Sequence, residues 1–151
     1  MQFLLFALLF VTTSCGHAQD LHKVERIVDG DTFVLVGGEK VRLIGIDTPE
    51  TVKPNTPVQP FGPEATQLAK TLLEGRSVRL ELDVQERDRY GRLLAYVYLE
   101  DGTFVNAEML KHGLAMVMTR PPNVKFSDEF VKLQQQARED KRGMWEMSNG
   151  Q

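Results

Sequence analysis

The sequence is poor in cysteine, in histidine and in long apolar runs. Its single cysteine, Cys15, cannot form a disulfide within the chain, which excludes a disulfide-stapled fold. Its three histidines, His17, His22 and His112, are scattered and form no zinc-binding cluster. The longest apolar run is shorter than the roughly 20 residues that a helix needs to cross a bilayer.

Positive charge is also scarce, because 18 Lys and Arg face 21 Asp and Glu, for a formal net charge of −3. This balance excludes a protein that coats nucleic acid through bulk positive charge. An anionic substrate must then be held locally, by a few placed cations or by a metal ion. With 42% hydrophobic and 26% charged residues, the 151-residue chain has the composition of one globular domain.

The N-terminus begins with an apolar segment, residues 1–11, and no charged residue occurs before Asp20. Such a segment is typical of a secretory signal. A Thr-Thr-Ser-Cys sequence ending at Cys15 resembles a bacterial lipoprotein site, cleaved before a lipidated cysteine. The small residues up to Ala18 instead allow ordinary cleavage after it. We expect residues 1–18 to be a leader and the protein to be exported from a bacterial cell, as a periplasmic, lipid-anchored or secreted chain.

Strand signals dominate the first part of the mature chain, residues 19–151. A Gly37-Gly38 pair predicts a hairpin turn. Five prolines between 49 and 63 exclude regular structure there and predict a long surface loop. Runs of β-branched residues and an apolar–polar alternation predict strands at 24–28, 33–36, 41–46, 78–84 and 93–99.

Three helices are predicted as well. The first begins near Pro63 and ends at Gly75, the second runs from an Asn106 cap to Gly113, and the third begins at Ser127 and closes at Gly143. The apolar side chains expected inward are Ala65, Leu68, Ala69, Leu72, Leu73, Phe130, Leu133 and Ala137, with Trp145 as a core plug. The order of elements fits an α+β fold, a five-stranded OB-type Greek-key barrel with three α-helices.

Acidic side chains occur at or just beyond predicted strand ends, in Asp29-Gly-Asp-Thr and in Asp47-Thr-Pro-Glu. The oxygens of Asp31, Asp47 and Glu50 suit Ca²⁺ or Mg²⁺. Read alone, the first motif is a hairpin turn and the second ends a strand, so both interpretations stay open.

Two arginines are candidates for phosphate binding. Arg42 lies within an apolar strand, where it either faces solvent or points into a site, and Arg92 follows the turn Asp-Arg-Tyr-Gly that begins at Asp88. Two guanidinium groups that converge on one phosphate stabilise the charge that develops in a transition state. Tyr90 is either a half-buried turn residue or a contact for a phosphate or a base.

The joint order of these motifs resembles the staphylococcal nuclease (thermonuclease) family. The motifs are Asp-Gly-Asp-Thr, Arg-x-x-x-x-Asp-Thr-Pro-Glu and Asp-x-Tyr-Gly-Arg, with Phe-Gly-Pro-Glu-Ala opening the first helix. Each motif is weak alone, but their order and spacing are specific, and the resemblance spans residues 23–146. It implies the same OB-type barrel and a calcium-dependent phosphodiesterase that cleaves DNA and RNA between phosphorus and the 5′ oxygen, leaving 3′-phosphates.

The resemblance also implies a role for each motif residue. Asp31 and Asp47 bind Ca²⁺ through their carboxylates and Thr48 through its backbone carbonyl, with Asp29 near the metal but outside its ligand set. Glu50 activates or orients the attacking water. Arg42 and Arg92 clamp the scissile phosphate, and Tyr90 and Arg89 contact the terminal phosphate of the nucleotide.

Two departures from the family pattern bear on substrate binding. No tyrosine pair follows Gly113-Leu-Ala, where the sequence reads Met-Val-Met-Thr-Arg-Pro-Pro over residues 116–122, and the Pro-rich loop has only one basic residue, Lys53. We expect weaker base stacking and a weaker grip on long polyanions. We expect a monomer, and the alternative function is a non-catalytic OB-type module that binds nucleic acid or a protein.

Overall fold

The computed structural model describes residues 20–51, 55 and 57–147, so the expected leader with Cys15 and part of the Pro-rich loop lie outside the described residues. None of the helices in this part of the chain has the length and apolar character to cross a membrane. The elements are β1 Leu21–Asp29, β2 Thr32–Leu35, β3 Lys40–Leu43, β4 Ile46–Asp47, α1 Gly62–Leu73, β5 Ser77–Glu81, β6 Leu93–Leu99, α2 Val105–Lys111, β7 Met116–Val117, α3 Ser127–Glu139 and a 3₁₀ helix, η1, at Gly143–Met147.

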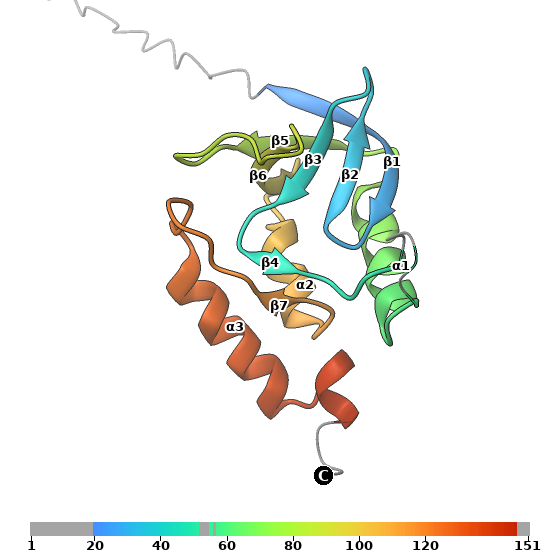
Figure 1. Cartoon of the computed structure of the whole chain (residues 1–151), viewed down its shortest axis with the longest axis vertical. Helices are drawn as coiled ribbons and strands as arrows, with labels where there is room; N and C mark the ends of the chain where they lie inside the picture. Colours follow the sequence, from blue (N-terminus) through green and yellow to red (C-terminus); the bar gives the residue numbers. More distant parts are fainter. Residues whose placement is uncertain (1–19, 52–54, 56, 148–151) are drawn as a thin grey trace, which may run out of the picture.

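Five strands close into a barrel in the order β1-β2-β3-β6-β5 (Figure 1). Neighbouring strands are antiparallel except β3 and β6, which are parallel, and β1 closes the barrel by pairing with β5. A separate ribbon forms where β4 pairs with β7 (Ile46 opposite Val117). The expected five-stranded barrel with three α-helices is confirmed.

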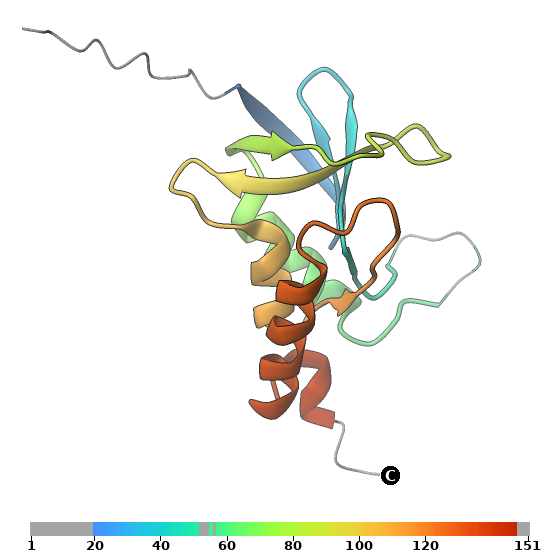
Figure 2. The same cartoon turned by 90° about the vertical axis from the view of Figure 1, so that its left-hand side faces the viewer.

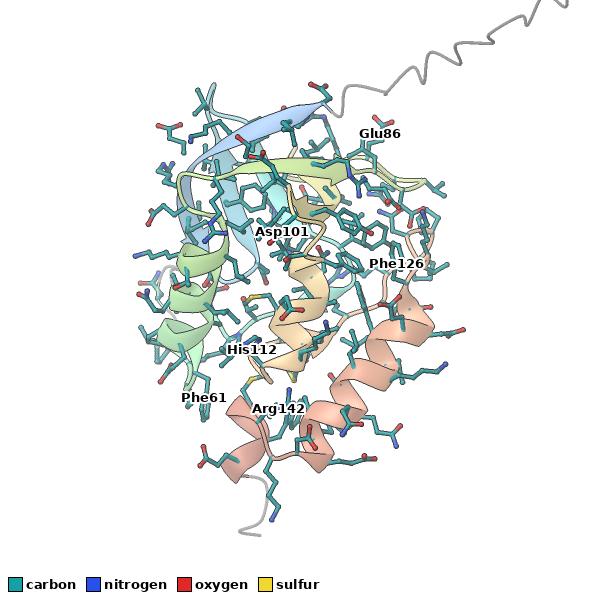
Figure 3. All side chains as sticks on the ribbon, turned by 180° about the vertical axis from the view of Figure 1, so that it is seen from behind. Phe61, Glu86, Asp101, His112, Phe126 and Arg142 are labelled. Atoms are coloured by element: carbon teal, nitrogen blue, oxygen red, sulfur yellow. The ribbon has the colours of Figure 1, made fainter. Side chains whose placement is uncertain are left out.

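The helices pack together against the barrel, and Figure 2 shows α2 and α3 side by side. Aromatic rings fill the junction: Tyr96 and Phe126 meet edge to face with centroids 4.6 Å apart, and Phe104 and Phe130 lie 5.6 Å apart. Phe126, labelled in Figure 3, directly precedes α3. The junction therefore fixes α3, and the chain segment before it, against the barrel.

The predicted strand 41–46 is in fact two strands, because the chain breaks at Gly45. The φ of Gly45 is +79°, and a Cβ there would lie 2.6 Å from the ring of Phe130. Glycine meets both demands, since it tolerates positive φ and close approach. The break redirects Asp47 away from the barrel and toward β7.

Three other expectations need correction. β5 ends at Glu81 rather than 84, and Leu82 and Val84 are 40% and 74% exposed, because the chain leaves the barrel there. Asn106 does not cap α2: it is fully buried inside the helix. α3 ends at Glu139 rather than Gly143, and η1 follows with Trp145, whose partly buried ring stacks 4.2 Å below Arg138.

Candidate active site

The tight turn between β1 and β2 presents Asp31, which ties this turn to the chain after β4. Its Oδ2 accepts hydrogen bonds from the backbone N–H and the hydroxyl of Thr48, both at 3.1 Å, and its Oδ1 accepts one from the Thr32 hydroxyl at 2.9 Å. Asp31 and Thr48 are both buried. The first two acidic motifs of the sequence therefore meet at one carboxylate.

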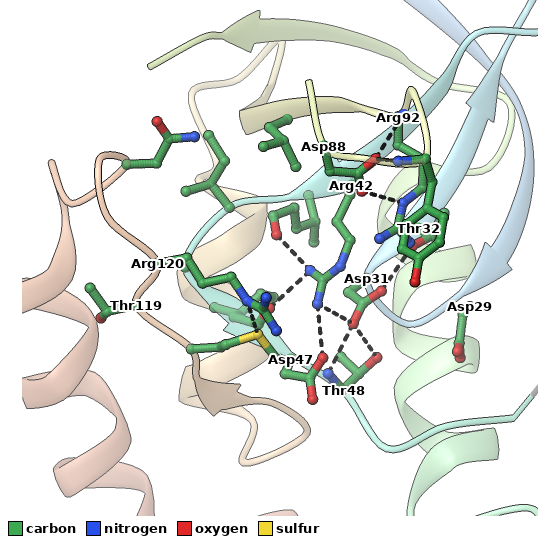
Figure 4. A pocket seen from close by; sticks show the side chains of 18 of the residues that line it. Asp29, Asp31, Thr32, Arg42, Asp47, Thr48, Asp88, Arg92, Thr119 and Arg120 are labelled. Atoms are coloured by element: carbon green, nitrogen blue, oxygen red, sulfur yellow. Dashed lines mark hydrogen bonds and ion pairs between the residues drawn. The ribbon is translucent and has the colours of Figure 1, made fainter. Parts of the chain in front are cut away.

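Arg42 lies between the two aspartates that the sequence singled out. Its Nη2 is 2.8 Å from Asp47 Oδ1 and 3.4 Å from Asp31 Oδ2 (Figure 4). Its Nη1 donates to the carbonyls of Leu43 and Ile46 at 2.8 and 2.9 Å. With its side chain 13% exposed, Arg42 does not face solvent, so that interpretation is wrong.

Asp47 experiences opposing influences. Burial raises the pKa of Asp47, while the positive charge of Arg42 and, more weakly, that of Arg120 oppose this rise; Asp31 and Glu50 add to it. The net pKa is higher than that of an ordinary aspartate, because desolvation of a carboxylate outweighs the nearby cations.

Asp88 shapes the turn that presents Arg92. Its Oδ1 accepts the backbone N–H groups of Tyr90 and Arg92 at 2.9 and 3.0 Å, and its Oδ2 accepts Arg92 Nε at 2.6 Å. Burial alone would raise the pKa of Asp88, but the hydrogen bonds from Arg92 and Tyr90 hold it below its usual range. An Asp at this position thus aims the guanidinium as well as forming the turn.

Tyr90 lies between two guanidinium groups on the same turn. Arg89 donates to the Tyr90 hydroxyl at 2.6 Å and lies 4.8 Å from the ring centroid, while Arg92 lies 5.5 Å from it. Tyr90 is 68% exposed, so its ring is open to a ligand. The turn is braced from outside by Arg87, whose guanidinium binds both carboxylate oxygens of Glu39 at 2.8 and 3.0 Å.

Asp29 and Glu50 form the opposite edge of the site. Asp29 Oδ1 accepts Gly30 N–H at 2.9 Å, the Thr51 hydroxyl at 2.8 Å and the Thr66 hydroxyl at 3.3 Å. Burial raises the pKa of Asp29, the Thr51 and Gly30 hydrogen bonds oppose that rise, and a hydrogen bond to Glu50 adds to it. The Asp29 and Glu50 carboxyl groups therefore interact electrostatically.

The candidate residues of all three motifs line one pocket with a volume of about 1180 Å³. The barrel brings together segments from three separate parts of the chain, and Figure 4 shows Arg42 at their meeting point. The predicted site residues among its lining are Asp29, Asp31, Arg42, Asp47, Thr48, Glu50, Arg89, Tyr90 and Arg92.

Comparison with known proteins agrees with this geometry. The family model described as staphylococcal nuclease homologue matches residues 40–147. The chain belongs to the staphylococcal nuclease family. It is 47% identical to the thermonuclease of Staphylococcus hyicus over 130 residues, covering 84% of this chain and 76% of that protein.

Two other relatives extend the comparison. The chain is 47% identical to the thermonuclease of Staphylococcus intermedius over 140 residues, which are 91% of this chain and 83% of that one. It is 45% identical to endonuclease YncB of Bacillus subtilis over 130 residues, which are 83% of this chain and 61% of that one. The family resemblance in the motifs is therefore confirmed over most of the chain.

A hard cation would find oxygen donors in this pocket of the nuclease fold. The carboxylates of Asp31 and Asp47 lie close together, since both contact Arg42 Nη2, at 3.4 and 2.8 Å. Among the described residues, no group of three or more Asp, Glu, His or Cys side chains converges into a metal cage. The two aspartates would supply only part of the roughly six to eight oxygen ligands that a Ca²⁺ ion takes.

The pocket also contains residues that sequence reasoning left without a role. Asp88 belongs to the Asp-x-Tyr-Gly-Arg motif, and its spacing of four residues from Arg92 could have predicted their ion pair. Gln59, whose Oε1 accepts the Glu50 N–H at 2.9 Å, lies in the Pro-rich loop and offered none. Arg120 precedes the Pro-Pro pair at 121–122 and lines the wall next to Asp47.

Proposed function

We propose that the chain is an exported, calcium-dependent nuclease that hydrolyses phosphodiester bonds of DNA and RNA and leaves 3′-phosphates. The observation that supports this most is the convergence of Arg42, Arg92 and Glu50 on one pocket with the carboxylates of Asp31 and Asp47. Relatives named as thermonucleases and as an endonuclease support nucleic acid as the substrate.

In this proposal, Asp31, Asp47 and the Thr48 carbonyl hold Ca²⁺, and Asp29 stays outside the ligand set. When bound, the ion would neutralise charge on a phosphate oxygen and so make attack of water on phosphorus easier. Arg42 contacts both aspartates, so its guanidinium would lie next to a phosphate bound to an ion at these carboxylates.

The remaining residues act on the scissile phosphate and on water. Glu50 takes a proton from the water that attacks phosphorus, and the bond to the 5′ oxygen breaks. Arg42 and Arg92 stabilise the charge that builds up on the phosphate oxygens. Arg92 also donates a hydrogen bond to the leaving 5′ oxygen, which takes its proton from solvent water. Tyr90 and Arg89, exposed on the turn beyond Arg92, contact the terminal phosphate of the nucleotide.

The test is cleavage of single-stranded DNA and RNA with Ca²⁺ and with a chelator. We expect cleavage only with Ca²⁺ and 3′-phosphate ends, and a rate lower by about 10²-fold or more in Glu50→Gln. Glu64→Gln, which makes the same change at an exposed position in the first turn of α1, is the matched control. A folded wild-type chain that binds DNA without cleaving it would support the non-catalytic module instead.

The proposal includes the leader, which lies outside the described residues. We propose that the leader within residues 1–18 directs export, and that the exported chain begins either at Gln19 or, when cleavage occurs before it, at a lipidated Cys15. Such an anchor is the sole membrane contact proposed, and the domain acts as a monomer. Mass spectrometry of the mature N-terminus decides between an acylated Cys15 and an unmodified Gln19.

A further inference from the structure

Arg120 lies in a short hairpin that follows β7, where it pairs with Asn123 across the Pro121-Pro122 turn. Met118 N–H donates to the Gly45 carbonyl at 2.9 Å, and Asn123 N–H donates to the Arg120 carbonyl at 3.0 Å. Because β7 pairs with β4, this hairpin forms the pocket wall next to Asp47. Figure 4 shows Arg120 and Arg92 on opposite sides of Arg42.

Asn123 fixes the hairpin to the other basic wall of the pocket. Its side chain is buried, its Oδ1 accepts Gln85 N–H at 2.8 Å and its Nδ2 donates to the Gln85 carbonyl at 2.7 Å. Gln85 lies three residues before Asp88, so both walls share one anchor. Arg120 is thus presented from a braced position, as a binding group requires.

Arg120 has no carboxylate ion pair of the kind that Arg42 and Arg92 form. Arg42 pairs with Asp47 at 2.8 Å, and Arg92 pairs with Asp88 at 2.6 Å. Within the described residues, no carboxylate lies within ion-pair distance of Arg120, whose Nε instead lies 3.0 Å from Met118 Sδ. Its exposed guanidinium presents a planar pair of donors, which suit a phosphate.

We infer that Arg120 binds a phosphate of the polynucleotide next to the scissile one, on the side away from Arg89 and Tyr90. This inference rests on the proposed nuclease function, in which Arg42 and Arg92 hold the scissile phosphate. Arg120 is then a specificity-determining residue that favours polymers over diesters with a single phosphate. It supplies, by charge, part of the grip on substrate that the missing tyrosine pair does not.

The first test compares two substrates in the wild-type background. One is a ten-nucleotide single-stranded DNA, and the other is a dinucleoside monophosphate, which has the scissile phosphate alone. We expect Arg120→Gln to raise KM for the ten-nucleotide DNA about tenfold with kcat nearly unchanged, and to leave both constants for the dinucleoside monophosphate unchanged. Arg120→Lys should restore most of the loss. Arg76→Gln, which removes an equal charge at an exposed site before β5 and outside the pocket, is the control.

The second test separates a phosphate contact from stacking on a base. Binding of the ten-nucleotide DNA is measured with Ca²⁺ at several salt concentrations, with Glu50→Gln present to prevent cleavage. Loss of one phosphate contact should make the slope of log K against log salt shallower by about 0.7 in Arg120→Gln. Weaker binding with an unchanged slope would assign Arg120 to a base and overturn the inference.

Other outcomes are equally decisive. If the wild-type chain cleaves both substrates and Arg120→Gln matches it on each, the Arg120 assignment fails while the nuclease proposal stands. If Arg120→Gln slows cleavage of both substrates alike, Arg120 acts at the scissile phosphate and the inference is overturned. If the folded wild-type chain cleaves neither substrate, the proposed function fails and the inference fails with it.

Discussion

At the scale of single residues, we expect Asp88 to act on activity by positioning turn residues, chiefly Arg92. It holds Arg92 by Nε at 2.6 Å and by the backbone N–H at 3.0 Å. Asp88→Asn keeps the size but removes the charge, so we expect kcat to fall about tenfold, whereas Arg92→Ala should lower it about 10²-fold or more. Steady-state kinetics on single-stranded DNA gives both values.

A double-mutant cycle checks that this loss passes through Arg92. In the Arg92→Ala background, Asp88→Asn should have little further effect on kcat, because there is no guanidinium left to orient. Asp101→Asn is the control, since Asp101 Oδ1 accepts the Thr103 N–H at 2.9 Å in a turn outside the pocket. Additive losses in the cycle would contradict a positioning role.

Asn106 links three parts of the chain from inside α2. Its Oδ1 accepts Val97 N–H at 2.9 Å, and its Nδ2 donates to the carbonyls of Ile44 at 2.9 Å and Ala95 at 3.4 Å. Asn106→Ala leaves these buried groups without their partner, so we expect the free energy of unfolding to fall by about 3 kcal/mol. Urea unfolding measures this, with Gln67→Ala at an exposed position of α1 as the control. Equal losses in the two variants would refute the bridging role.

At the scale of elements, Gly113 after α2 and Gly143 at the start of η1 allow the two segments to meet closely. The φ of Gly113 is +67°, and a Cβ there would collide with the backbone carbonyl of Arg142, while Met144 N–H donates to the Gly113 carbonyl at 2.9 Å. Because the atoms that a Gly113 Cβ would meet belong to the backbone of Arg142, they cannot move aside as the end of a flexible side chain can. This close contact fixes η1 against the body of the molecule.

Gly113→Ala and Gly75→Ala separate crowding from backbone strain. Gly75 has a similar φ of +70°, but a methyl group added there would have no atom within 4 Å, so its substitution should cost about 1 kcal/mol. Gly113→Ala should cost about 3 kcal/mol or more, because the same strain is joined by a collision. Thermal unfolding of both variants measures the difference, and similar losses would show that the contact with Arg142 relaxes freely.

Sequence patterns located most elements but not the way each meets its neighbours. The strand predicted at 93–99 has the same bounds as β6, because its apolar residues mark the strand locally. The apolar–polar alternation over 78–84 extends beyond the end of β5. Pairing with β6 stops at Glu81, and the local sequence does not show where the partner strand ends. Asn106 resembled a helix cap because Asn is common there, and only the tertiary fold reveals its buried partners.

At the scale of the whole molecule, the site unites motifs that lie far apart in the sequence. Their order allowed the resemblance to a family, and the pairing of β2 with β3 then places Thr32 beside Arg42, which brings Asp31 to the guanidinium. Arg120 could not be foreseen in the same way, because its place depends on the pairing of β7 with β4. A net charge of −3 is compatible with phosphate binding, since cations that matter are concentrated in one pocket.

The response to acid should separate activity from stability. The pKa values of Asp29 and Asp47 are raised mainly by burial, so in the folded protein both accept a proton at a higher pH than in the unfolded chain. Protonation in that window stabilises the metal-free fold, yet protonation of Asp47 removes a proposed calcium ligand. Asp88, whose pKa is lowered despite its burial, stabilises the fold above the ordinary aspartate range and stops doing so only as the pH falls through its own lower value.

We therefore expect activity at fixed Ca²⁺ to decline first as the pH falls, and the fold to be lost at distinctly lower pH. Raising Ca²⁺ should shift the loss of activity to lower pH, because the ion competes with protons for Asp47. Cleavage rates and far-UV circular dichroism across the same pH series measure the two transitions. Coincident transitions, or an activity limb that does not respond to Ca²⁺, would mean that unfolding rather than protonation of the site limits the enzyme in acid.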